Sequence, residues 1–74
     1  MERRVIRQGT QIDAIREANG VTTRQFRGGA VLNLLQWTRP DQARFTVEGE
    51  GAEIWFCPQS LLDKHTMRSE AAAG

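Results

Sequence analysis

Residues Arg16 to Gly29 have the sequence REANGVTTRQFRGG, and the fold of the chain depends on what this stretch forms. Asn19-Gly20 can end a helix, because glycine readily adopts the left-handed conformation that closes a last turn. Thr22 or Thr23 can then cap a second helix through its side-chain oxygen. This order predicts the corner of a helix-turn-helix, although Gly28-Gly29 falls where the second helix should continue and costs about 1 kcal/mol per glycine.

The residues before this stretch carry the pattern of a helix. Ile12, Ile15 and Ala18 follow one another at helical spacing. Thr10 can cap the segment, and Asp13 lies three residues later, in the position of a capping box. The pattern predicts a helix of about ten residues that ends at the asparagine-glycine pair.

The residues after the stretch are ambiguous. Phe26, Ala30, Leu34 and Trp37 recur at helical spacing, which favours a second helix that runs to about Trp37 with a break at the two glycines. The segment from Ala30 to Trp37 is also compatible with a buried strand, because periodicity alone does not separate the two for a short apolar run. Both alternatives stay open, and the helix is favoured.

Strands are expected on either side of this helical region. Residues 3–8 predict a short edge strand or an extended lead-in. Residues 43–48 and 52–57 alternate apolar and polar side chains around a glycine-rich tip, Gly49-Glu50-Gly51. This pattern predicts a β-hairpin.

The end of the chain suits a closing helix. Pro58 fits the first turn of a helix, and Leu61 and Leu62 supply its apolar side. A chain of 74 residues can bury one modest core. We therefore expect a single domain over residues 1–68, with a frayed tail at 69–74.

The single cysteine and the short apolar runs bound the setting. Cys57 has no second cysteine to pair with, so the fold depends on packing, and a reducing cytoplasm is expected. Its apolar neighbours Phe56 and Pro58 favour a buried structural thiol over a nucleophile. The longest apolar stretch, Ala30–Leu35, is interrupted by Asn33 and is far shorter than the ~20 residues of a membrane span. The N-terminus has no apolar core after its basic residues, so neither a membrane segment nor a secretory signal is expected.

The charge is distributed unevenly along the chain. The net charge is +1, but residues 1–40 carry seven arginines against three acids, a net +4, and residues 41–74 carry three basic residues against six acids, a net −3. A basic half made of arginine suits phosphate or carboxylate recognition, because the guanidinium forms paired hydrogen bonds. Arginine-rich composition typical of a GC-rich genome is an equally good explanation.

The expected order of elements resembles a winged helix-turn-helix domain of the MerR or excisionase type. The matching residues are Ile12 and Ile15 on the first helix, Gly20-Val21-Thr22 at the turn, Phe26 as the inward anchor of the second helix, and Glu53 to His65 as wing strand and closing helix. The resemblance spans most of residues 10–65. It implies an α+β fold, a small winged-helix-like domain in which the helix-turn-helix is followed by a β-hairpin and a C-terminal helix.

By this resemblance the protein is expected to bind double-stranded DNA as a non-enzymatic regulatory or recombination-accessory protein. Arginine can pair with guanine edges or phosphates, and threonine can reach a phosphate while it caps a helix. A domain this small covers little duplex, so a homodimer is expected if it reads a specific site. The residues expected at DNA are Arg3, Arg4, Arg7, Thr22, Thr23, Arg24 and Arg27.

A protein-directed inhibitor encoded by a phage or mobile element is the alternative. The hairpin tip is acidic, whereas a wing that lies along DNA needs positive charge. Such a tip can instead occupy the basic groove of a host nucleic-acid-handling enzyme, with a tryptophan as the anchor. The residues expected at that partner are Trp37, Glu48, Glu50, Glu53 and Trp55.

Catalysis is the least expected class of function. The chain has one histidine, His65, and one cysteine, with no pair at metal-ligand spacing and no phosphate-loop glycine pattern. Asp63 lies two residues from His65, so on a helix the two side chains point in different directions. No enzyme activity, metal or cofactor is expected.

Overall fold

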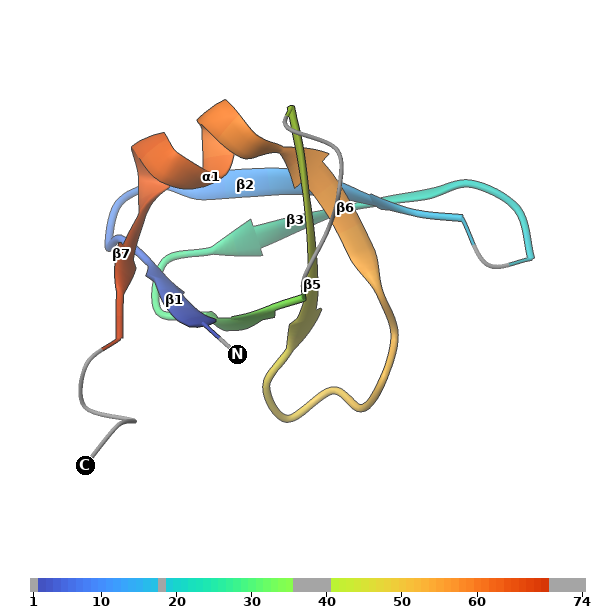
Figure 1. Ribbon diagram of the computed structural model, residues 1–74, viewed down its shortest axis with the longest axis horizontal. Helices are drawn as coiled ribbons and strands as arrows, with labels where there is room; N and C mark the ends of the chain where they lie inside the picture. The colour runs from blue at the N-terminus through green and yellow to red at the C-terminus, as the bar shows by residue number, and fades with distance from the viewer. Residues whose placement is uncertain (1, 18, 36–40, 70–74) are drawn as a thin grey trace.

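The computed structural model describes residues 2–17, 19–35 and 41–69 of the chain (Figure 1). Within these residues there are seven strands and one short helix, and the strands form one antiparallel sheet in the order β3-β2-β6-β5-β4-β1-β7. The elements are β1 Glu2–Ile6, β2 Gln11–Arg16, β3 Thr22–Arg27, β4 Val31–Leu34, β5 Gln42–Val47, β6 Trp55–Pro58, α1 Gln59–His65 and β7 Thr66–Arg68.

This architecture contradicts the expected α+β winged helix-turn-helix, which is wrong. The predicted first helix is strand β2, and the start of the predicted second helix is strand β3. The favoured continuation of the second helix to about Trp37 is also wrong, because Val31–Leu34 forms strand β4, in agreement with the strand alternative for this segment. Trp37 itself lies outside the described residues.

The first error arises from the period of the apolar residues. In β2, Ile12 and Ala14 are fully buried, and Ile15 points to the outer face and is 42% exposed. The segment therefore has the two-residue period of a strand. Asn19 and Gly20 have φ angles of 58° and 109°, and positive φ angles at two successive residues are typical of hairpin turns as well as of helix ends.

The glycine pair has a packing role that the helical prediction could not explain. A Cβ atom on Gly28 would lie 2.6 Å from the carbonyl oxygen of Arg7 and 2.8 Å from Cα of Gln8. The Gly28 amide donates to the Thr10 carbonyl at 3.1 Å, and the Gly29 amide donates to the Ile6 carbonyl at 2.8 Å. The glycines let the β3–β4 turn pack directly on the β1–β2 turn.

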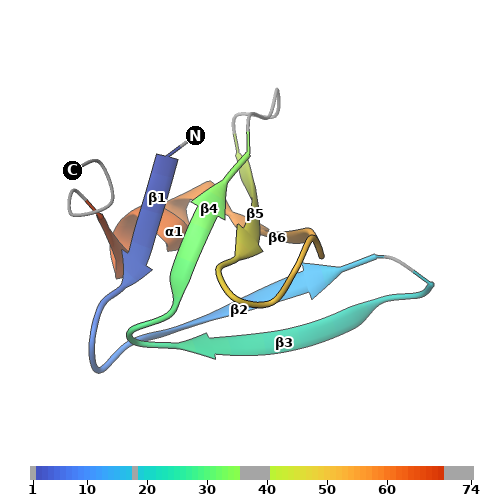
Figure 2. The same ribbon diagram turned by 90° about the horizontal axis from the view of Figure 1, so that it is seen from below.

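The sheet bends over on itself to enclose its core. Phe26 on β3 makes edge-to-face contacts with Phe45 on β5, at 5.8 Å between ring centroids, and with Trp55 on β6, at 5.1 Å. Strands β3 and β5 are separated by two strands in the sheet, so these contacts require a sharp bend (Figure 2). The buried apolar residues are Ile6, Ile12, Ala14, Phe26, Leu32, Ala43, Phe45, Val47, Trp55, Cys57 and Leu62.

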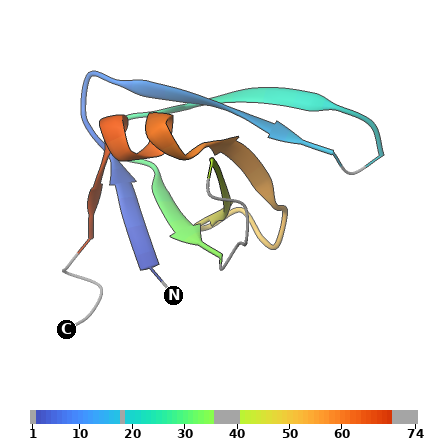
Figure 3. The same ribbon diagram turned by 45° about the horizontal axis from the view of Figure 1, so that its top comes forward.

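The predicted hairpin and closing helix are confirmed. Strands β5 and β6 pair from Gln42 opposite Pro58 to Phe45 opposite Trp55, and α1 follows directly. Helix α1 packs against β2, β5, β6 and β7, where its Leu62 is fully buried (Figure 3). The short edge strand or extended lead-in expected at residues 3–8 is strand β1, which pairs with both β4 and β7 and so does not lie at the edge of the sheet.

Candidate functional site

Most charged side chains of the described chain are paired with one another. The acidic loop between β5 and β6 contains Glu48, Glu50 and Glu53, and each of them meets an arginine from another part of the sheet. The ion pairs are Arg3–Glu48, Arg16–Glu53, Arg24–Glu50 at 2.5 Å, Arg4–Glu2 at 2.7 Å, Arg4–Asp63 at 3.6 Å and Arg68–Glu2 at 2.9 Å.

Arg24 is the most constrained of the arginines predicted to face DNA. Its Nη1 and Nη2 atoms donate to the two carboxylate oxygens of Glu50 at 2.5 and 2.7 Å. The hydrogen bonds from this guanidinium hold the pKa of the Glu50 carboxyl below its usual value. The guanidinium carbon also lies over the rings of Phe26, at 4.6 Å, and Trp55, at 5.8 Å. Arg24 therefore joins the β2–β3 hairpin to the β5–β6 loop.

The other predicted DNA residues are dispersed. Arg24 and Arg27 do not share a helical face, because they are three residues apart on strand β3 and point to opposite sides. Thr22 and Thr23 cap no helix; they lie at the exposed start of β3, opposite Arg16 and Ile15. Arg3 and Arg4 belong to β1 and are ion-paired, and Arg7 follows that strand.

The residues predicted to contact a host protein are also engaged within the chain, as far as they are described. Trp55 is only 3% exposed and packs on Phe26, and the three glutamates have the arginine partners named above. Trp37 lies outside the described residues. The acidic loop thus carries little uncompensated charge toward a partner.

The charges without an ion-pair partner fall into two groups in the described part of the chain. The carboxylates without an ion-pair partner are Asp13, Glu17 and Asp41. Asp13 accepts a hydrogen bond from the Gln25 side-chain amide at 3.3 Å. The cations of this kind are Arg7, Arg27 and Lys64.

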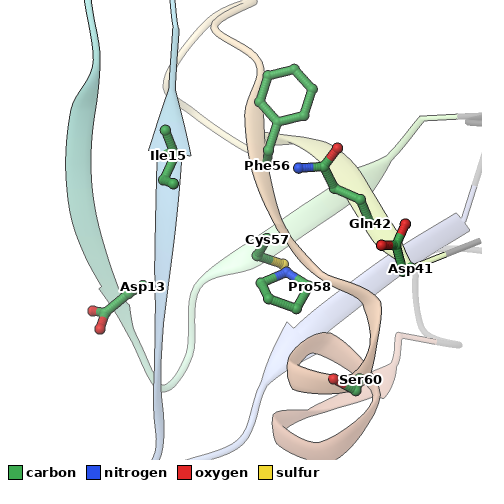
Figure 4. A pocket seen from close by; sticks show the side chains of 8 residues that line it. All are labelled: Asp13, Ile15, Asp41, Gln42, Phe56, Cys57, Pro58 and Ser60. Atoms are coloured by element: carbon green, nitrogen blue, oxygen red, sulfur yellow. The ribbon is translucent and has the colours of Figure 1, made fainter. Parts of the chain in front are cut away.

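Two of those carboxylates line the groove shown in Figure 4, which lies between β2 and β6. The two strands are joined by one bridge pair in the described sheet, Ile15 opposite Phe56. Beyond it, Pro58 ends β6 and the chain turns into α1, whose first amide donates to the Asp41 carbonyl at 3.0 Å. The strands separate there and leave a cavity of about 540 Å³.

The groove has an apolar floor and a polar rim. Ile15, Phe56 and Pro58 come from the outer face of the sheet and provide the apolar surface. The polar residues stand on separate sides, with Asp13 on the β2 side and Asp41 beside β5 (Figure 4). The remaining lining residues are Gln42, Cys57 and Ser60.

Cys57 is a buried thiol, as predicted from its neighbours. Burial raises the pKa of this thiol from about 9.0 to about 11, so the thiol stays protonated and weakly nucleophilic near neutral pH. Across residues 2–17, 19–35 and 41–69, no group of three or more histidine, cysteine, aspartate or glutamate side chains is placed to hold a metal ion.

Sequence reasoning missed the groove because it assigned Ile15 to a helix core. The available signal was the alternation of Ile12 and Ala14 with Gln11 and Asp13, which places Ile15 on the opposite face from the core.

The described chain contains no helix long and apolar enough to cross a membrane. Comparisons with protein-family models, with curated proteins and with solved structures gave no significant match to this chain.

Proposed function

We propose that this protein is a small protein-binding module that accommodates an extended segment of a partner protein in the groove between β2 and β6. The observation that carries this proposal is the outward-facing apolar surface of Ile15, Phe56 and Pro58 between two carboxylates that have no ion-pair partner in the described chain. The cavity volume of about 540 Å³ lies within the range of ligand pockets, about 300–1,000 Å³.

The apolar floor supports a partner with an aliphatic or proline side chain. Ile15 is 42% exposed although its strand is flanked by β3 and β6, and it lies opposite Phe56. Covering such a side chain contributes on the order of 1 kcal/mol through the hydrophobic effect. The polar groups are spread around the rim, which suits a chain that runs through the groove better than a compact small molecule.

The carboxylates support a lysine or arginine in the same segment. Asp13 and Asp41 lie on opposite sides of the groove, so a basic side chain beside the apolar contact would meet negative charge on either side. Electrostatic complementarity of this kind increases the association rate and selects against acidic partners. Binding should weaken as the salt concentration rises.

The partner protein contacts the groove between β2 and β6, and not the acidic β5–β6 loop. Glu48, Glu50 and Glu53 already neutralise arginines of the same chain, so binding through them would have to break those ion pairs. The lone thiol of Cys57 supports a reducing, cytoplasmic setting for this interaction.

Selection from a random twelve-residue peptide library displayed on phage tests the proposal. We expect enriched peptides that combine an aliphatic or proline residue with a lysine or arginine. Ile15→Glu should reduce their affinity about tenfold or more, because it places a carboxylate on the groove floor. Val21→Glu is the matched control, since Val21 is 75% exposed on the β2–β3 connection and does not line the groove. A failure to enrich any peptide, or an equal loss with both variants, would contradict the proposal.

A further inference from the structure

A second polar surface lies at the end of the molecule where three segments meet. The β1–β2 turn and the β3–β4 turn lie side by side there (Figure 2), and the Gly28 amide joins them through its bond to the Thr10 carbonyl. The Arg7 amide donates to the carbonyl of His65, the last residue of α1, at 2.9 Å, and the Thr10 hydroxyl donates to the Arg7 carbonyl at 2.8 Å. The backbone therefore fixes the turns and the helix end together.

The segments that meet here carry the three cations without an ion-pair partner in the described part of the chain. Arg7 belongs to the first turn, Arg27 ends β3 at the second turn, and Lys64 lies in the last turn of α1. All three side chains are exposed, and none has a carboxylate within ion-pair distance among the described residues. Every other described arginine has a partner within the chain.

Polar groups surround Arg27 on this surface. A shallow hollow beside it is lined by Gln8, Thr10 and Gln11 together with Gly9 and Gly28. Amide and hydroxyl side chains of this kind bond to phosphate and sugar oxygens in nucleic-acid complexes. Gly9 has no side chain and has open space beside it, which allows a ligand backbone to approach the β1–β2 turn closely.

We propose that this surface, which we call the basic end and define as Arg7, Arg27 and Lys64 with the hollow lined by Gln8, Thr10 and Gln11, is a contact site for the phosphate backbone of double-stranded nucleic acid. The described aromatic residues Phe26, Phe45 and Trp55 are buried, and Phe56 belongs to the groove, so the basic end has no described platform for stacking unpaired bases. A spread of cations with polar neighbours suits the regularly spaced phosphates of a duplex.

The salt dependence of binding provides the quantitative test. We expect the protein to bind a fluorescein-labelled mixed-sequence duplex of 20 base pairs with the weak affinity of non-specific binding, about 10⁻⁴–10⁻⁶ M. Three phosphate contacts predict a slope of log affinity against log salt near −2.7, or a loss of about 40-fold between 50 and 200 mM salt. The double variant Arg7→Gln/Arg27→Gln should bring the slope to about −0.9 and the loss to about 3.5-fold.

A matched control separates a site from net charge alone. Arg68 is 70% exposed and pairs with Glu2 on β1, so Arg68→Gln removes one positive charge elsewhere on the surface and should leave the slope near −2.7. The single variant Arg27→Gln removes the same number of charges and should bring the slope to about −1.8. Circular dichroism should show that all variants keep the native strand content. The proposal would be overturned by no duplex binding at 20 mM salt, by equal losses in the Arg68 variant, or by binding to anionic phosphatidylserine vesicles without binding to the duplex.

Discussion

Gly28→Ala provides the sharpest test of the bent sheet. The methyl group would meet backbone atoms on the neighbouring turn, at 2.6 Å from the Arg7 carbonyl oxygen and 2.8 Å from Cα of Gln8. Backbone atoms cannot rotate away as the end of a long side chain can. The turns would have to separate, which strains the bond from the Gly28 amide to Thr10 and the bond from the Gly29 amide to Ile6.

The expected cost follows from the size of this clash. Forcing a methyl group into a packed site costs typically 1–3 kcal/mol, and two contacts below 3.0 Å with rigid atoms place this variant near the upper part of that range. A domain of 74 residues has a folding free energy of roughly 4–11 kcal/mol and loses about 6 °C of Tm per kcal/mol. We therefore expect a fall in Tm of about 12–18 °C.

Thermal unfolding and urea titration followed by circular dichroism measure this effect. Gly49→Ala is the control. Gly49 has a φ angle of 88° but open space around the position of an added Cβ atom, so alanine there costs only the conformational strain of about 1–2 kcal/mol. In a helix, alanine at residue 28 would stabilise the protein by about 1 kcal/mol. A Gly28→Ala variant as stable as the wild type, or more stable, would refute the close packing of the two turns.

Three further predictions concern the core and the titrating groups. Phe26→Ala should lower the free energy of unfolding by about 3–5 kcal/mol in urea titrations, because it removes the ring that packs on Phe45 and Trp55; a loss below about 1 kcal/mol would contradict the enclosed core. The Cys57 thiol should leave the free energy of unfolding unchanged below about pH 9. As the pH rises toward 11, it should lower that free energy by up to about 2.5 kcal/mol, because the unfolded thiol releases its proton first. Alkaline unfolding curves of Cys57→Ala should lack this step, and an identical pH profile would disprove it. In NMR titrations the pKa of the Glu50 carboxyl should lie below 4.5 and should return toward 4.5 in Arg24→Gln; an unchanged titration would rule out the Arg24–Glu50 contact. The contribution of this ion pair to stability should be present above pH 4.5 and be lost as the pH falls through the lowered pKa.

The second half of the fold was accessible from the sequence because its signals agree with one another. Residues 43–48 alternate apolar and polar side chains before a glycine-rich tip, and Pro58 marks the helix that follows strand β6. Local pattern and tertiary structure point to the same elements there.

The first half was not accessible because its strongest local signals fit two structures. The pair Asn19-Gly20 is compatible with either a helix end or a hairpin turn, because both need positive φ angles. Ile12 and Ile15 are spaced for a helix face, yet only Ile12 enters the core. The deciding contact is the packing of Phe26 on Phe45 and Trp55, and no local pattern predicts a contact across that distance in the chain.

The candidate sites depended on this missing tertiary information. Arg24 and Arg27 look equivalent in the sequence, but the fold pairs Arg24 with Glu50 and gives Arg27 no ion-pair partner among the described residues. Lys64 was not predicted as a binding residue because it lies in the acidic half of the chain, and only the position of α1 brings its helical turn beside the β1–β2 turn. Charge along a sequence therefore predicts which residues can bind a ligand, and the ion pairs of the folded chain decide which remain available.

The most direct test of the proposed function is a ¹⁵N-NMR titration of the protein with a peptide obtained from the library selection. A segment held between β2 and β6 predicts that the largest shift changes occur at Asp13, Ile15, Gln42 and Phe56, and that they are lost in Ile15→Glu but kept in Val21→Glu. Shift changes centred on the acidic loop at Glu48–Glu53, or spread evenly over the chain, would contradict the assignment of the groove as the protein-binding site.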